Sequence, residues 1–167
     1  MSTLIKNQAI IPDTWQHLET GADPASQPLP EADILFPVAL WQARRNEIIS
    51  RYKRIGLWLE PDADLESLAD DLHYFQVIAI HFPKFADGRG YSLARLLRER
   101  HHFEGELRAV GDVLHDQLFF MKRVGFDAWA LKEGKNAEKA LHAFATFQNP
   151  YQGATDEPNP LFRRRNP

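Results

Sequence analysis

The feature that most constrains the fold is a regular alternation of strand-like and helix-like segments between Ile55 and Phe147. The segment "IGLWLEP" precedes "DADLESLADDLHYF", "QVIAIHFP" precedes "LARLLRER", "ELRAVGDV" precedes "HDQLFFMKRV", and "FDAWALK" precedes "KNAEKALHAFATF". The first member of each pair is a short apolar run, whereas the second repeats apolar residues at helical spacing. Successive units of this kind form a parallel sheet through right-handed crossovers. We therefore predict an α/β fold with a parallel sheet of consecutive βα units, either open and three-layered or a partial barrel.

The residues before this alternation carry weaker signals. The segment "TLIKNQAIIPDTWQHL" predicts a small strand pair, and "ETGADPASQPLPEAD" is rich in the residues of surface loops. A helix is predicted over residues 38–53, after a short strand-like run.

We predict one α/β domain over residues 1–148, in which residues 1–32 form an N-terminal strand appendage and a loop, and residues 33–148 form the main βα fold. Residues 149–167 are predicted to form a Pro-rich, Arg-containing tail.

Composition excludes several classes of function. The chain of 167 residues has a formal net charge of -3, which gives no general attraction to nucleic acid or to an anionic membrane. It has no cysteine, so a thiol nucleophile, a Cys-bound zinc and a Cys-ligated iron–sulfur cluster are excluded, and redox chemistry would need a borrowed cofactor or a partner. No long apolar segment is present, so we expect a cytoplasmic protein with neither a nucleic-acid nor a membrane partner.

Unusual polar residues follow two of the predicted strands. In parallel α/β folds, ligands bind where strands end and the following helices begin. The loop after "QVIAIHFP" and the helix start that follows it carry Lys84, Asp87, Gly88, Arg89, Gly90, Tyr91, Ser92 and Arg95. The loop after "ELRAVGDV" carries Gly111, Asp112, His115, Asp116 and Gln117. If the two strands are neighbours, both loops lie on one rim of the sheet.

The first loop predicts an anion or substrate site. Gly88 and Gly90 would turn the backbone at positive φ and expose amide groups. The other residues predicted to bind an anion or substrate are Lys84, Arg89, Tyr91, Ser92, Arg95, Arg108 and Gln117. The alternative is structural: the glycines form the turn, Ser92 is the N-cap of the helix, and Arg95 pairs with Glu99.

Three carboxylates form a second candidate group, because Asp87, Asp112 and Asp116 would project from adjacent strand ends. Carboxylates so placed serve in proton transfer or hold Mg²⁺. We assign them as the catalytic candidates and predict no metal site. The alternative is that Asp116 caps a helix and that Asp87 pairs with Arg89 or Arg108. His81 lies within an apolar strand and is predicted to be a packed, hydrogen-bonded core histidine.

Three stretches of the sequence resemble a bacterial domain family of unknown function: "IGLWLEPDADLESLADDL", "FPKFADGRGYSLARLLRER" and "GELRAVGDVLHDQLFFMKRVGFDAW". The resemblance covers about residues 33–133, and Trp129 stands where the family tends to have Phe. Members of that family are encoded beside assimilatory sulfite-reduction genes and are labelled as an oxidoreductase of sulfite reduction. The family pattern falls on both predicted rim loops.

Two functions follow from the resemblance together with the residues. The first is an accessory protein of assimilatory sulfate and sulfite reduction that binds a small anion or a partner such as sulfite reductase at the rim. The second is a small enzyme of sulfur metabolism that acts on an anionic substrate, with a borrowed cofactor or with the three aspartates as acid–base catalysts. We favour the first and leave the cofactor unassigned. A partial barrel would have open edges, so a homodimer is also predicted.

Overall fold

The structure is a computed structural model that describes residues 3–131, 136–144, 154–156 and 158. Its elements in chain order are β1 (Thr3–Lys6), β2 (Ala9–Pro12), β3 (Gln16–His17), β4 (Ile34–Pro37), α1 (Val38–Arg51), β5 (Ile55–Leu59), η1 (Glu66–Tyr74), β6 (Val77–Phe82), α2 (Arg89–Glu99), β7 (Glu106–Gly111), η2 (His115–Gln117), α3 (Leu118–Arg123), β8 (Ala128–Ala130) and α4 (Ala137–Ala143). The strands of this described part form one sheet in the order β2-β1-β8-β7-β6-β5-β4-β3.

The sheet is mixed rather than purely parallel. Strands β3 to β8 pair in parallel, as the strand–helix alternation predicts. Strand β1, however, pairs antiparallel with both β2 and β8. The prediction of a separate N-terminal appendage is therefore wrong, because the predicted strand pair extends the main sheet. Alternation within the chain could not reveal this pairing, since it joins the first strand to the last.

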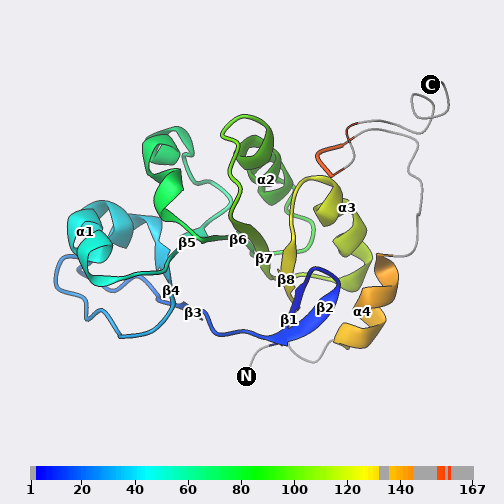
Figure 1. The fold of residues 1–167 in the computed structure, drawn as a ribbon, viewed down its shortest axis with the longest axis horizontal. Helices are drawn as coiled ribbons and strands as arrows, with labels where there is room; N and C mark the ends of the chain where they lie inside the picture. The colour runs from blue at the N-terminus through cyan, green and yellow to red at the C-terminus, as the bar shows by residue number, and fades with distance from the viewer. Residues whose placement is uncertain (1–2, 132–135, 145–153, 157, 159–167) are drawn as a thin grey trace.

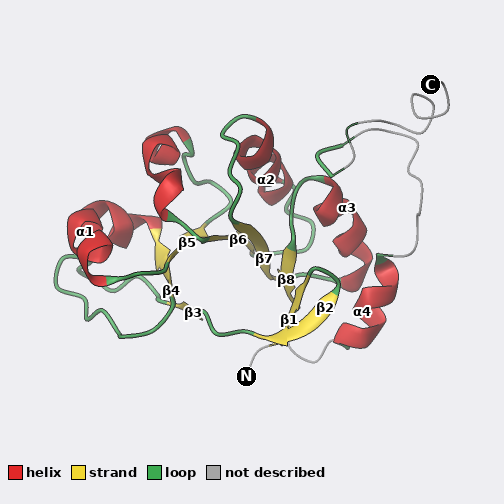
Figure 2. Ribbon diagram, viewed as in Figure 1, coloured by secondary structure: helices red, strands yellow, loops and turns green. Residues whose placement is uncertain are grey.

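The sheet curls into an open half-barrel, with α1, α2, α3 and α4 outside the arc of strands (Figures 1 and 2). The helix-covered face buries Leu57, Ile78, Ile80 and Leu107, with Trp129 from β8. Alternate residues of the same strands point to the inner face, as strand geometry requires. Both faces of β6 are therefore covered, in agreement with its apolar sequence.

The segment between β2 and β3 explains why the sheet must curl. A flat eight-stranded sheet would hold its edge strands about 33 Å apart, at about 4.8 Å per strand. Only residues 13–15 separate the edge strand β2 from the edge strand β3, and that stretch of chain spans at most about 14 Å. Figure 1 shows this chain passing along the open side of the arc. We call residues 13–15 the strap.

The strap is fixed to the inner face of the half-barrel by one apolar and one ionic contact. Trp15 is buried in a small cluster with Leu35, Val77, Ala79 and Val110. Asp13 accepts a hydrogen bond from Nη1 of the buried Arg108 (2.7 Å). These contacts tie the N-terminal segment to β7, near the middle of the sheet.

Several element boundaries differ from their predictions. The predicted helix after β5 is a 3₁₀ helix, η1. Helix α2 begins at Arg89 with Gly88 at its N-cap, so Ser92 lies inside the helix and its prediction as the N-cap is wrong. Helix α3 ends before Gly125, as predicted, with Gly125 at φ 113°. Helix α4 begins after Asn136, whose side chain accepts hydrogen bonds from two amides of the first turn.

Most of the predicted tail, residues 149–167, lies outside the described residues. The part that is described contacts α2 and α3. The Thr155 amide donates a hydrogen bond to the Arg123 carbonyl (3.1 Å), and the Thr155 hydroxyl donates to Glu99 (3.0 Å). Asp156 forms an ion pair with Arg123 (3.2 Å).

None of the helices in the described ranges has the length and the apolar character that crossing a bilayer requires.

Candidate functional site

The loops after β6 and β7 lie together, because the two strands are parallel neighbours. The Phe85 amide donates a hydrogen bond to Asp112 Oδ2 (3.1 Å), and Gln117 Nε2 donates to the Phe85 carbonyl (2.6 Å). The Asp112 amide in turn donates to the carbonyl of Phe82 (2.8 Å). We call these two joined loops, with the helix starts that follow them, the rim; it comprises residues 83–92 and 112–120. The sequence reasoning that brought them together is confirmed in its geometry.

Asp87 and Arg89 form a closed pair on the rim. Asp87 accepts hydrogen bonds from the backbone amide of Arg89 (3.1 Å) and from Nε (3.0 Å) and Nη2 (2.7 Å) of its side chain. The hydrogen bonds from the Arg89 side chain are the main cause that lowers the pKa of Asp87 to about 2. A carboxyl with this pKa stays ionised near neutral pH and is poorly matched to general acid–base catalysis.

Neither Gly88 nor Gly90 has unusual backbone geometry, and only Gly90 is required by packing. Gly88 has φ -75°, and Gly90 also lacks a positive φ, so the prediction of positive φ at both positions is wrong. A Cβ on Gly90 would lie 2.6 Å from the Phe82 ring, so glycine lets α2 approach β6 closely. The described glycines that do have positive φ are Gly111 and Gly125.

Arg95 and Tyr91 of α2 have structural contacts. Arg95 Nε forms an ion pair with Glu99 (2.9 Å), which is the alternative considered from the sequence. The Tyr91 ring packs edge-on against Phe82 (5.5 Å between centroids), and burial raises the pKa of Tyr91. Ser92 and Lys84 are exposed.

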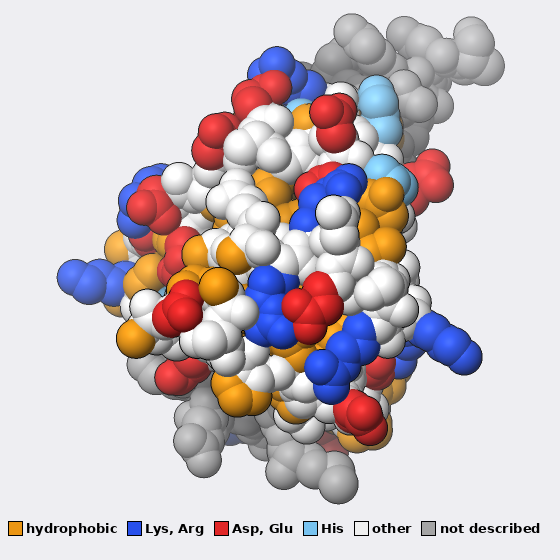
Figure 3. Space-filling view, turned by 90° about the vertical axis from the view of Figure 1, so that its left-hand side faces the viewer, with side chains coloured by type: hydrophobic (Ala, Val, Ile, Leu, Met, Phe, Trp, Pro, Cys, Tyr) orange, Lys and Arg blue, Asp and Glu red, His pale blue; other side chains and the backbone are white. Residues whose placement is uncertain are grey.

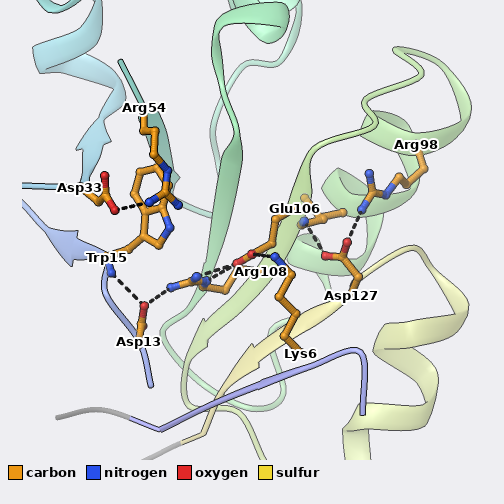
Figure 4. Close-up of polar contacts among 10 residues, drawn as sticks. Lys6, Asp13, Trp15, Asp33, Arg54, Arg98, Glu106, Arg108 and Asp127 are labelled. Carbon is orange, nitrogen blue, oxygen red and sulfur yellow. Dashed lines mark hydrogen bonds and ion pairs between the residues drawn. The ribbon is translucent and has the colours of Figure 1, made fainter. Parts of the chain in front are cut away.

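Arg108 is not at the rim. Its side chain lies on the inner face, where Nε (2.7 Å) and Nη2 (2.6 Å) contact Glu106 and Nη1 contacts Asp13. Glu106 also accepts a hydrogen bond from Lys6 Nζ (2.6 Å), so two cations and two anions form one network (Figure 4). The network thus connects β7 to the strap through Arg108 and to β1 through Glu106 (Figure 4).

The three candidate carboxylates do not form one constellation. Asp87 is held by Arg89, Asp112 accepts the Phe85 amide, and Asp116 lies 2.7 Å from His115 with 78% of its side chain exposed. No three His, Cys, Asp or Glu side chains among the described residues are grouped so that they could hold a metal ion.

The rim also presents aromatic rings to solvent. Phe85 is 54% exposed and Phe120 is 63% exposed, and Phe119 contacts the Phe120 ring. Asp112 and Gln117 hold the Phe85 backbone, as described above. The sequence favours a core or interface position for Phe119 and Phe120 and leaves Phe85 unassigned, because an apolar residue in a loop or helix does not by itself predict exposure.

A second group of functional candidates lies at the carboxyl ends of β3, β4 and β5. His17 stacks on Trp58 with 3.7 Å between ring centroids and 13° between planes. Glu60 accepts hydrogen bonds from Trp58 Nε1 and interacts with His81 Nδ1, both at 2.8 Å. His81 is hydrogen-bonded as predicted, but 28% of its side chain is exposed, so it lies at the edge of the core.

Sequence reasoning missed this second group, although one signal was present. Trp58 and His81 occupy the inner-face positions at the ends of their strands, and Glu60 follows directly after β5. His17 lies on β3, a strand of two residues that no periodicity could predict.

Charges on the face at the left of Figure 1 are interspersed in sign. Figure 3 shows Lys and Arg side chains next to Asp and Glu side chains over this face. Helix α1, at the left of Figure 1, carries one ion pair of neighbouring opposite charges, Arg44 with Glu47 (2.6 Å). No broad basic surface for nucleic acid is visible on this face (Figure 3).

The fold and the rim define a mixed α/β protein with a curled sheet and a closely connected loop edge. The family model described as "Bacterial protein of unknown function (DUF934)" matches residues 56–162, and the chain belongs to this family. No curated protein and no solved structure matches the chain. The matched region contains the rim together with Trp58, Glu60 and His81, whereas the strap and His17 precede it.

Proposed function

We propose that the protein is a non-catalytic accessory component of assimilatory sulfite reduction, and that it binds a sulfite-reduction enzyme through the rim. The observation that carries the binding role is the exposure of Phe85, whose loop is hydrogen-bonded to Asp112 and Gln117, and of Phe120, which lies in the first turn of α3. Exposed aromatic rings on an ordered support are typical anchors of protein interfaces. The link to sulfite reduction comes from the family resemblance of the rim sequence.

The charges of the rim favour a binding role over acid–base catalysis. Asp87 is kept ionised by Arg89, and its pKa of about 2 lies far from that of a group that exchanges protons near neutrality. The Asp112 carboxylate accepts a hydrogen bond from the Phe85 amide and so has a structural contact. A small anion would have to displace Asp87 from Arg89 or Glu99 from Arg95, since both arginines already contact a carboxylate.

The partner is expected to offer an apolar surface with polar groups around it. Phe85 and Phe120 would enter that surface, while the exposed charges of Arg89 and Asp116 would lie near its edge. Edge charges of this kind affect the association rate more than the affinity.

The test is the affinity of the purified protein for purified sulfite reductase, measured by calorimetry. We expect the double variant Phe85→Ser/Phe120→Ser to weaken binding at least about tenfold, since truncation of one aromatic anchor costs about 2 kcal/mol or more. Leu96→Ser is the matched control, because Leu96 is also a large exposed hydrophobic residue (41%) but lies on α2.

Circular dichroism would verify that both variants retain the native fold. Equal affinity of the double variant and the wild type would refute the rim as the interface. Absence of any binding between the wild-type protein and the reductase would refute the choice of partner.

A further inference from the structure

A pocket of about 370 Å³ lies at the carboxyl ends of β3, β4 and β5, on the same edge of the sheet as the rim but lined by none of its residues. The start of α1, from Pro37 to Ala39, forms an apolar wall, and Trp58 forms another. Glu19, Glu60 and Asp62 also line the pocket. It therefore combines apolar walls with carboxylates.

The aromatic wall is held in place. Trp58 is stacked by His17 on one face and donates its indole N–H to Glu60 (2.8 Å). His81 contacts the other oxygen of Glu60 (2.8 Å), so the carboxylate is fixed from two strands. A preformed wall of this kind reduces the entropy cost of binding.

The formal charges that line the pocket are negative, and the nearby rim cation Arg89 is paired chiefly with Asp87, which together with Asp62 raises the pKa of Arg89. The lining residues of the pocket include three carboxylates and neither lysine nor arginine. Burial is the main cause that lowers the pKa of His17, so this imidazole is neutral near pH 7. Burial would raise the pKa of Glu60, but hydrogen bonds from His81 and Trp58 outweigh it and lower that pKa, so Glu60 is ionised.

We propose that this pocket binds a small organic cation, with its ammonium group at Glu60 and Asp62 and its apolar body against Trp58 and the start of α1. The Trp58 ring has His17 stacked on it and His81 close to it (5.1 Å between centroids), so it offers the ligand an apolar wall, and charge-assisted hydrogen bonds to the carboxylates favour the ammonium group. The positive end of the α1 dipole opposes this choice. It amounts to about half an elementary charge, which is less than the charge of the three carboxylates.

The probes are phenethylamine, its uncharged analogue 2-phenylethanol and its anionic counterpart phenylacetate. Binding is followed from the indole N–H signal of Trp58 in ¹H–¹⁵N NMR spectra, which is assigned by its loss in Trp58→Phe. We expect phenethylamine to shift this signal in a saturable manner. The other two compounds should bind at least about tenfold more weakly, since a hydrogen bond to a charged group contributes about 1.5–3 kcal/mol.

Two variants test the role of the carboxylates. Glu60→Gln and Asp62→Asn are each expected to weaken phenethylamine binding, Glu60→Gln by about tenfold. Asp62 is exposed, so Asp62→Asn leaves packing intact even if Glu60→Gln shifts His81 and Trp58. Glu104→Gln is the matched control and should bind as the wild type does, because Glu104 is exposed and precedes β7 at the opposite end of the strands.

Three results would overturn the proposal: no saturable shift with phenethylamine at millimolar concentration, phenylacetate binding as tightly as phenethylamine, or unchanged affinity in both carboxylate variants. The second result would assign the pocket to anions held at the start of α1. The outcome is independent of whether the rim binds a reductase.

Discussion

The strap between β2 and β3 yields a prediction that can be worked out in energy. Asp13 accepts a hydrogen bond from Arg108, whose side chain is 2% exposed, and also accepts one from the Trp15 amide (3.0 Å). In Asp13→Ala, Arg108 would remain buried with Glu106 as its remaining carboxylate. Removal of one partner from a buried ion pair costs about 3–5 kcal/mol, and the retained contact to Glu106 places the expected loss near 3 kcal/mol.

Urea unfolding followed by far-UV circular dichroism measures this loss directly. For a chain of this length, about 3 kcal/mol corresponds to a melting temperature about 6–12 °C lower. Asp13→Asn keeps an acceptor oxygen for the Trp15 amide, so we expect it to lose less stability than Asp13→Ala. The difference between the two variants separates the backbone contact from the loss of the carboxylate charge.

Asp33→Ala is the matched control for this series. Asp33 pairs with Arg54, but their side chains are 26% and 54% exposed, so its removal should cost no more than about 1 kcal/mol. If Asp13→Ala were as mild as Asp33→Ala, the strap would not stabilise the half-barrel through Arg108, and the account of its closure would be wrong.

Three further outcomes are expected. The carboxyl ¹³C signal of Asp87 should titrate with a midpoint near pH 2, and this midpoint should move back towards the ordinary value of 3.8 in Arg89→Gln. Because the folded-state pKa of Asp87 is depressed, the stabilisation from the pair is present above about pH 4 and is lost as the pH falls towards 2. An unshifted midpoint in the wild type would contradict this. Gly111→Ala should destabilise the folded protein by at least about 1 kcal/mol in urea unfolding, because Gly111 has φ 95° and a Cβ there would lie 2.5 Å from a backbone oxygen. Gly88→Ala is the control: its Cβ would meet no atom within 4 Å, so the free energy of unfolding should change by less than about 1 kcal/mol. If the protein is the predicted homodimer, its mass measured by light scattering should be twice 19.2 kDa. Ile10→Lys should dissociate the dimer, since Ile10 is 42% exposed on the edge strand β2. A monomeric mass for the wild type would contradict the prediction.

The central part of the fold could be predicted because its signals are local. Strands β5, β6 and β7 are short apolar runs, and each is followed by a segment that repeats apolar residues at helical spacing. The parallel order of these strands follows from the handedness of their crossovers, so the proximity of the β6 and β7 loops was also predictable.

The sequence allowed a partial barrel as one of two architectures, but the contacts that hold the half-barrel curled could not be predicted, because they join distant residues and short elements. Asp13 and Arg108 are 95 residues apart, and neither position predicts the other. Strand β3 has two residues, and the pairing of β1 with β8 joins the two ends of the main fold. Arg108 was therefore read as a rim cation when it is a buried contact of the strap.

The details of the rim depended on side-chain partners that residue types alone leave open. The sequence allowed Asp87 to pair with Arg89 or Arg108, and the structure selects Arg89. It allowed Ser92 to cap α2, but the helix begins three residues earlier. The exposure of Phe85 could not be predicted from its neighbours in the sequence, because its backbone is hydrogen-bonded to Asp112 and Gln117, which are 27 and 32 residues away.

The most direct test of the central claim is growth of a strain that lacks this protein on sulfate, sulfite or sulfide as sole sulfur source. The account predicts growth on sulfide but not on sulfite, and restoration of growth on sulfite by the wild type and by Asp87→Asn but not by Phe85→Ser/Phe120→Ser. Normal growth of the deletion strain on sulfite would contradict a role in sulfite reduction. Failure of Asp87→Asn with success of the double aromatic variant would instead indicate a catalytic rim.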